Sequence, residues 1–185
     1  MSGNARAKAG LARRVATLGI LTALSLVTFI IENQFPPMFI PGAKMGLANV
    51  FSFAALILYS PIDAFIVVGV RTLLGALFAG NFSAVLYSFT GGVVSMAVSS
   101  LLLYLVHPKI SVMSISVVAA VFHNITQNAV FCLLSGSALA FGYLPYLVLL
   151  GILAGAIVGG IIMLVFKKVP RSVFGKAINL ENKAR

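Results

Sequence analysis

Six long runs of apolar residues follow one another along the chain, separated by short clusters of turn-forming residues. The runs cover residues 15–31, 44–60, 62–80, 83–106, 112–134 and 143–166. A helix needs about 20 residues, within a range of roughly 17 to 25, to cross the hydrocarbon core of a bilayer. Each run therefore predicts one transmembrane helix. The break between the second and third runs is the shortest, and Pro61 favours a turn there because proline fits the first turn of a new helix.

The composition agrees with this pattern. Of the 185 residues, 61% are hydrophobic and 9% are charged, whereas a soluble domain carries about 25% charged residues. A soluble chain of this length has too little interior to bury that much apolar surface, so lipid must solvate it. We therefore expect an all-α integral membrane protein with six transmembrane helices over residues 15–166, flanked by basic segments at residues 1–14 and 167–185.

The net charge of +10 comes mostly from the two ends of the chain. Four lysine or arginine residues precede the first run and six follow the last, beginning with Lys167. Basic residues beside membrane spans stay in the cytoplasm, so we expect a multi-pass cell-membrane protein with both termini cytoplasmic and an even number of spans. The same placement indicates contact with lipid and argues against nucleic-acid binding. No small-residue cleavage site follows the first run, which favours an uncleaved first helix.

Arg71 is the most costly residue in the predicted spans, because it lies near the middle of the third one. An arginine at that depth costs at least roughly 2.5 to 3.5 kcal/mol. Two interpretations remain open: an internal partner, either Glu32 or backbone carbonyls, and a bound anion or polar ligand. Glu32 and Asp63 both lie near the ends of their runs. We therefore expect water and a polar or anionic ligand, rather than a carboxylate of the chain, to satisfy Arg71.

The fifth run carries a polar cluster at its centre, where five of the six residues 123–128 are polar. His123 and Gln127 share one helix face, and Asn124 and Asn128 share another, because residues four apart align. Hydrogen bonds between helices explain one such residue, at about 0.6 kcal/mol per contact. Five together favour a hydrated cavity or a binding pocket.

Other candidate ligand contacts flank these two groups. The proline-rich segment 35–43 is either a lid over a pocket or an interfacial connector. The candidate substrate-binding residues are Lys44, Asn49, Arg71, Asn81, Tyr87, His123, Asn124, Gln127 and Asn128.

Two series of small residues recur at helix-packing spacing. One is Gly151, Gly155 and Gly159 in the last run, and the other is Gly19 with Ala23 in the first. Small faces let helix backbones approach closely in lipid. Both contact within the monomer and docking of another membrane subunit remain open. Ala12 and Ala16 extend the first series toward the cytoplasmic edge and favour docking.

Several kinds of chemistry lack their signatures. The sequence has no phosphate-binding loop, so it does not power itself with ATP through one. His107 and His123 are isolated from other ligating residues, and no paired aspartates hold magnesium. We expect no catalytic residues, no metal and no cofactor, and therefore no enzyme activity.

Some segments nevertheless resemble a known family. The similarity lies in residues 41–49, 71–75, 80–83 with 87–88, 91–92 and 123–127, within residues 15–166. These segments resemble the Gx transporter family, also labelled heptaprenyl diphosphate synthase component I, which is similar to the six-helix S components of energy-coupling factor transporters. The resemblance implies a substrate-binding subunit of a small-molecule or vitamin-type importer, coupled to a transmembrane subunit with two ATPases through small residues of the first helix. The alternative is an accessory membrane protein in prenyl diphosphate, quinone or flavin-linked electron-transfer metabolism.

Overall fold

The computed structural model describes residues 3–34, 46–79 and 82–168. Lys44, Asn81, the segment 35–43 and the basic tail 169–185 lie outside these ranges. The elements in chain order are α1 (Gly3–Gln34), α2 (Asn49–Leu58), α3 (Pro61–Ala79), α4 (Phe82–Leu105), α5 (Val112–Ser135), the short 3₁₀ helix η1 (Ala138–Tyr143) and α6 (Leu144–Lys167). No strand occurs within the described ranges, so the all-helical class is confirmed for them.

Five of these helical segments are long and apolar enough to cross a membrane, namely α1, α3, α4, α5 and α6 with η1 before it. The second helix is the exception, because α2 has only 10 residues. At about 1.5 Å per residue it is about 15 Å long, or half the thickness of the hydrocarbon core. The prediction of a full transmembrane helix over 44–60 is therefore wrong within the described residues, where the helix begins only at Asn49.

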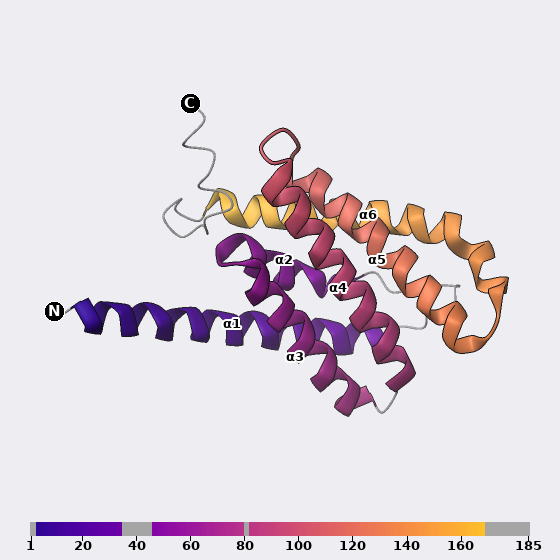
Figure 1. Cartoon of the computed structure of the whole chain (residues 1–185), viewed down its shortest axis with the longest axis horizontal. Helices are drawn as coiled ribbons and strands as arrows, with labels where there is room; N and C mark the ends of the chain where they lie inside the picture. Colours follow the sequence, from indigo (N-terminus) through magenta and orange to yellow (C-terminus); the bar gives the residue numbers. More distant parts are fainter. Residues whose placement is uncertain (1–2, 35–45, 80–81, 169–185) are drawn as a thin grey trace.

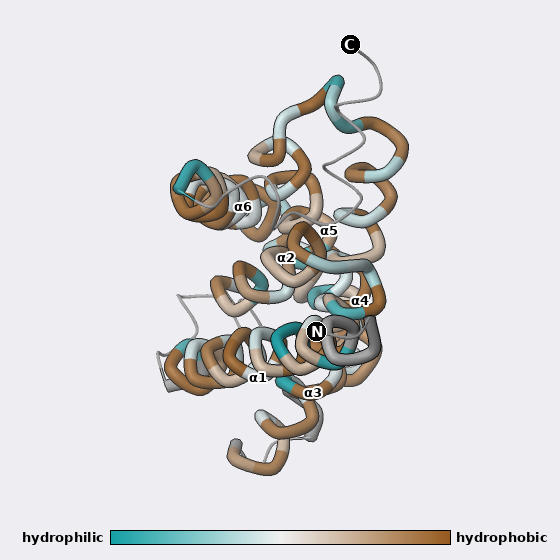
Figure 2. The backbone as a smooth tube through the Cα atoms, turned by 90° about the vertical axis from the view of Figure 1, so that its left-hand side faces the viewer, coloured by the Kyte–Doolittle hydropathy of each residue, from teal (hydrophilic) through white to brown (hydrophobic). Residues whose placement is uncertain are grey.

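The reason for this error is the environment of α2. Seven of its residues are buried, including two polar ones, Asn49 and Ser52. The helix contacts α1, α3, α4 and α6, and Figure 2 shows it enclosed between α1 and α6. An apolar run of 10 to 14 residues is as typical of a buried core helix as of a membrane segment. Hydropathy alone does not distinguish apolar residues that face protein from those that face lipid.

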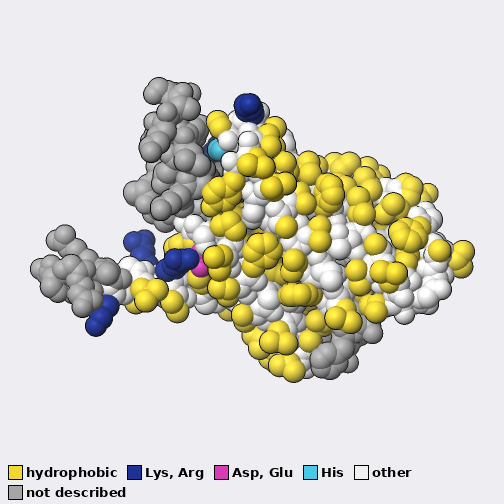
Figure 3. Space-filling view, viewed as in Figure 1, with side chains coloured by type: hydrophobic (Ala, Val, Ile, Leu, Met, Phe, Trp, Pro, Cys, Tyr) yellow, Lys and Arg dark blue, Asp and Glu magenta, His cyan; other side chains and the backbone are white. Residues whose placement is uncertain are grey.

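The helices α1 and α3 run in the same direction, with the short α2 between them, and α3 to α6 then alternate in direction (Figure 1). The N-terminal end of α1 lies on the same side of the bundle as the C-terminal end of α6. Apolar side chains cover most of the visible face, as expected for a surface in contact with lipid (Figure 3). The lysine and arginine side chains in that view lie in the half that holds the N-terminal end of α1. The interior is a core cluster from α2 to α6, with Phe53, Leu56, Met96 and Ile115 among its members.

The glycine series of α6 packs inside the monomer. A Cβ atom added at Gly155 would lie 2.5 Å from the Val117 Cα, and one added at Gly159 would lie 2.8 Å from the Met113 Cα. Only glycine permits such close contact between the backbones of α5 and α6. For this series, contact within the monomer is the correct interpretation.

The small residues of α1 are placed differently. Ala12, Ala16, Gly19 and Ala23 are all exposed, and a Cβ added at Gly19 would meet nothing within 4 Å. Packing within the described part of the monomer therefore does not explain this stripe.

A single ion pair joins α1 to the start of α3. The Arg14 Nη2 lies 2.5 Å from Oδ2 of Asp63, and its Nε donates to Oδ1 at 3.2 Å. Ser60 also donates to Asp63, from its Oγ to Oδ2 at 2.5 Å. Asp63, near the end of its predicted span, is thus engaged in the first turn of α3, eight residues before Arg71.

Candidate binding site

Arg71 lies at the centre of a buried polar network that joins three helices. Its side chain, on α3, is 2% exposed. Nη2 donates to Oδ1 of Asn49 at 3.0 Å, and Nη1 donates to Oγ of Ser25 at 3.3 Å. Ser25 in turn donates to the carbonyl of Ala48 at 2.9 Å. The guanidinium carbon also lies 6.0 Å from the ring centre of Phe29. Side chains of α1 and α2 thus accept hydrogen bonds from the two Nη groups of the arginine.

Glu32 places a carboxylate on the same cavity lining as Arg71. Both residues line one small cavity, and the negative charge of Glu32 acts favourably on the guanidinium. Glu32 Oε1 also accepts the N–H of Leu47 at 2.6 Å, just before α2. The two residues thus share one lining, although Glu32 lies near the end of its predicted run. The predicted first span ended at residue 31, whereas α1 continues to Gln34 and carries Glu32 inside the bundle.

The four predicted residues of α5 are all buried, but they face different neighbours. Nδ1 of His123 lies 3.4 Å from Nδ2 of Asn49, and Gln127 lines the cavity beside Arg71. Asn124 instead donates from Nδ2 to the carbonyl of Leu147 on α6 at 2.8 Å. Hydrogen bonding between helices therefore accounts for Asn124, whereas His123 and Gln127 belong to the network around Arg71.

Four buried polar atoms find no hydrogen-bond partner among the described residues. They are Nε of Arg71, Nε2 of Gln127, Nδ2 of Asn128 and Oγ of Ser52. A buried polar group left unpaired costs about 1 to 3 kcal/mol, and a charged one costs more. Two of these donors, on Arg71 and Gln127, line the same cavity, so an acceptor placed there would satisfy both.

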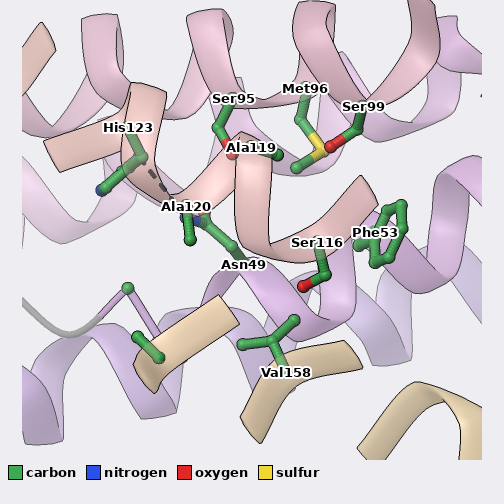
Figure 4. Close-up of a pocket in the computed structure, with 12 residues that line it drawn as sticks. Asn49, Phe53, Ser95, Met96, Ser99, Ser116, Ala119, Ala120, His123 and Val158 are labelled. Carbon is green, nitrogen blue, oxygen red and sulfur yellow. Dashed lines mark hydrogen bonds between the residues drawn. The ribbon is translucent and has the colours of Figure 1, made fainter. Parts of the chain in front are cut away.

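Two cavities lie on either side of the contact between Asn49 and His123. We call the first the arginine cavity; it is lined by Phe29, Glu32, Gly46, Ala48, Asn49, Arg71, Ser88, His123 and Gln127. The second, the serine cavity, is lined by Ser95, Ser99 and Ser116 together with Gly46, Asn49, His123 and apolar residues of α2, α4, α5 and α6. Figure 4 shows its serine, alanine and methionine side chains around the contact between Asn49 and His123.

Both cavities are small as they stand. The volume open to the centre of a water molecule is about 10 Å³ in the arginine cavity and about 20 Å³ in the serine cavity. One water needs about 10 to 15 Å³ by this measure. A larger occupant therefore has to displace side chains. The residues common to both linings are Gly46, Asn49 and His123.

Two adjacent glycines let α4 approach this network. A Cβ added at Gly91 would lie 2.7 Å from Cγ of Gln127 and 3.1 Å from Nδ1 of His123. One added at Gly92 would lie 3.3 Å from Nη2 of Arg71. Any side chain at Gly91 would push Gln127 and His123 out of their present positions. The glycine pair thus contributes to the shape of the cavity without donating a polar group.

The remaining predicted residues are Asn49, which belongs to the polar network, Tyr87, which does not line either cavity, and Lys44 and Asn81, which are not described. Asn49 is the first residue of α2 and contacts both Arg71 and His123. Tyr87 lines neither cavity; its ring packs edge-on against Phe131, with ring centres 6.2 Å apart. Lys44 and Asn81 remain untested because they lie outside the described residues.

The sequence analysis missed the serines of the site. Ser88, Ser95 and Ser99 are buried on α4, and their spacing of seven and four residues places them on one helix face. That spacing was a usable signal. It was overlooked because serine in a membrane helix commonly bonds to its own backbone and carries little information by itself.

The polar side chains of the site are hydrogen-bonding groups. Among the described residues no group of three or more histidine, cysteine, aspartate or glutamate side chains is placed to hold a metal. The polar groups instead present unpaired N–H donors beside a carboxylate. Such an arrangement is suited to a small molecule that both accepts and donates hydrogen bonds.

Comparison with known proteins agrees with the resemblance seen in the sequence. No curated protein matches the chain. The family described as heptaprenyl diphosphate synthase component I matches residues 21–168. This range includes α2 to α6, the C-terminal part of α1 from residue 21 on, and every described residue of the two cavities. The chain therefore belongs to the heptaprenyl diphosphate synthase component I family.

Proposed function

We propose that this protein is the substrate-binding membrane subunit of a small-molecule importer that separate subunits energise. The observation that carries the proposal is the pair of unpaired donors in one cavity, Nε of Arg71 and Nε2 of Gln127. Both side chains are 2% exposed. Membrane proteins retain such costly buried groups where they meet a ligand or line its path.

Asn49 and His123 complete the proposed binding site. Their contact of 3.4 Å is at the long end for a hydrogen bond. A ligand that replaced it would join the arginine and serine cavities, because these two residues line both. Asn128 and Ser52 contribute further unpaired polar atoms nearby in the bundle. Tyr87 and Asn124 support this site through packing and through a hydrogen bond to α6.

A partner must supply the energy in this proposal, because the sequence has no phosphate-binding loop. We assign the partner to a transmembrane coupling subunit with two ATPases. Its docking surface is the α1 stripe, defined as Ala12, Ala16, Gly19 and Ala23, all of which are exposed. Small exposed residues permit close approach of a second helix in lipid. The basic ends of the chain would then face the cytoplasm, where the ATPases bind.

The family description favours a second candidate function. A chain described as a synthase component works beside other subunits, so an accessory role in prenyl diphosphate, quinone or flavin-linked metabolism is the alternative. A catalytic role is not part of it. Prenyl diphosphate chemistry uses aspartate-rich magnesium sites, and the whole chain has three acidic residues.

Small molecules that copurify with the protein test the proposal. Wild-type protein, Arg71→Met and Leu73→Met are extracted in mild detergent, and the bound compounds are released and identified by mass spectrometry. Leu73 is the matched control, because it lies two residues further along α3 and is 65% exposed. We expect one compound in the wild type and in Leu73→Met that is absent from Arg71→Met. Copurification of a prenyltransferase, with no such compound, would favour the accessory role.

A further inference from the structure

The arginine cavity has balanced charge. Arg71 and Glu32 both line it, and the remaining described residues of its lining are uncharged when His123 is neutral. The formal charges of these described residues then sum to zero. In addition, Glu32 already acts on the Arg71 guanidinium. An anion that entered would therefore meet not only the Arg71 cation, as the sequence suggested, but also the Glu32 carboxylate on the same lining.

From the balance among the described lining residues, we propose that the occupant of the arginine cavity is a small molecule without net charge. It presents a carbonyl-type acceptor to Nε of Arg71 and Nε2 of Gln127, and an N–H or O–H donor to Glu32. The inference rests on the proposed function and specifies its substrate class.

The acceptor side follows from the unpaired donors. Nε of Arg71 is the one guanidinium nitrogen without a partner, since Nη1 donates to Ser25 and Nη2 donates to Asn49. Nε2 of Gln127 is a second donor on the same lining. Donors on one lining call for acceptor lone pairs, which a carbonyl oxygen offers. An apolar occupant would leave both donors unpaired and is therefore disfavoured.

The donor side follows from Glu32. Its Oε1 accepts the Leu47 N–H at 2.6 Å, and a carboxylate offers about four lone-pair sites in total. A ligand carboxylate or phosphate would be repelled by this charge, and repulsion between like charges is strong where water is excluded. A ligand N–H or O–H would be attracted to it. Neutral molecules that carry a donor and an acceptor close together meet both requirements.

The geometry also indicates where the rest of such a molecule lies. The ring of Phe29 lies against the Arg71 guanidinium and lines the arginine cavity, so it gives a planar occupant an apolar contact. Displacing the contact between Asn49 and His123 opens the way to Ser95 and Ser99 in the serine cavity. These hydroxyls both donate and accept, so they suit further uncharged polar groups.

The test uses the full chain in detergent and a metabolite extract of the producing cells as the probe. Wild type, Arg71→Met, Glu32→Gln and Asp63→Asn are incubated with the extract and washed, and the retained compounds are identified by accurate mass. Asp63→Asn is the matched control, because it also converts a carboxylate to an amide but does so in the first turn of α3, where Asp63 pairs with Arg14 and is not among the lining residues of the cavity. We expect a retained neutral compound whose affinity falls at least tenfold in Glu32→Gln and in Arg71→Met, and is unchanged in Asp63→Asn.

The possible outcomes separate the two proposals. A retained anion that Arg71→Met loses, and that binds more tightly in Glu32→Gln, would overturn the inference and leave the proposed function intact. A neutral compound that binds Glu32→Gln as tightly as the wild type would also overturn it. If the wild type retains no compound, the proposed function fails and the inference fails with it. The charge of the compound bound to the wild type decides between neutral and anionic ligands even if a variant does not fold.

Discussion

The Nη2 group of Arg71 donates to Oδ1 of Asn49 over 3.0 Å, and this bond ties the middle of α3 to the first residue of α2. The other end of the same amide, Nδ2, faces His123 on α5. One asparagine thus connects a buried cation to the helix that carries the polar cluster. The start of the short helix α2 and the shape of the binding site consequently depend on the same side chain.

The charge balance between Arg71 and Glu32 predicts a pattern of stabilities. Arg71→Met leaves the Glu32 carboxylate and Asn49 Oδ1 without their cation, so we expect the free energy of unfolding to fall by about 3 kcal/mol. Arg71→Met combined with Glu32→Gln removes both charges and should recover a large part of that loss. Thermal unfolding in detergent measures it, with Leu73→Met as the control that should not change. A double variant no more stable than Arg71→Met would contradict coupling between the two residues.

The close packing of α6 on α5 predicts different effects for two neighbouring glycines. Gly155→Ala forces a Cβ to within 2.5 Å of the Val117 backbone, and overpacking of this kind costs about 2 kcal/mol. Gly160→Ala should be neutral or slightly stabilising, because its nearest neighbour is the flexible end of Met113 at 3.8 Å. Thermal unfolding of the two variants checks the contrast. Equal midpoints would mean that the helices separate easily at Gly155.

The ion pair between Arg14 and Asp63 predicts an asymmetry between its two partners. The Asp63 side chain is 4% exposed and that of Arg14 is 45% exposed. Arg14→Gln leaves a buried carboxylate with Ser60 as its remaining side-chain partner, so we expect a loss of about 2 kcal/mol. Asp63→Asn frees an arginine that already reaches solvent, and should cost less than about 1 kcal/mol. Unfolding midpoints at low and high salt measure both, and a larger loss in Asp63→Asn would refute this assignment.

The α1 stripe predicts a substitution that separates assembly from folding. Gly19→Leu adds a side chain where a Cβ would meet nothing within 4 Å, so the unfolding midpoint of the isolated chain should stay within about 1 °C of the wild type, as for most surface changes. Complex formation with the coupling subunit should be lost, as measured by copurification. Gly69→Leu is the matched control on α3, because a Cβ there would also meet nothing within 4 Å. Retained assembly in Gly19→Leu would remove the stripe as the docking surface.

The sequence by itself determined the features that depend on local composition. Long apolar runs predicted six helices, and five of the described helices are long and apolar enough to cross a membrane, because length and hydropathy are local properties of a segment. The N-terminal end of α1 and the C-terminal end of α6 lie on one side of the bundle (Figure 1), although the predicted even number of full-length spans was not found among the described residues. The polar residues of α5 stood out in the sequence because the free-energy cost of placing a polar side chain in hydrocarbon depends on residue type.

Only the tertiary structure decided which partners those residues have. It placed Glu32 and Asn49 beside Arg71 and paired Asn124 with the Leu147 carbonyl of α6. It also enclosed α2 among other helices, so that a helix of 10 residues is buried there without crossing the hydrocarbon core. It also turned the glycines of α6 inward and left Gly19 outward, although both series have the same spacing. The physical reason is that spacing fixes which residues share a helix face, whereas the direction of that face depends on how the helices pack against one another.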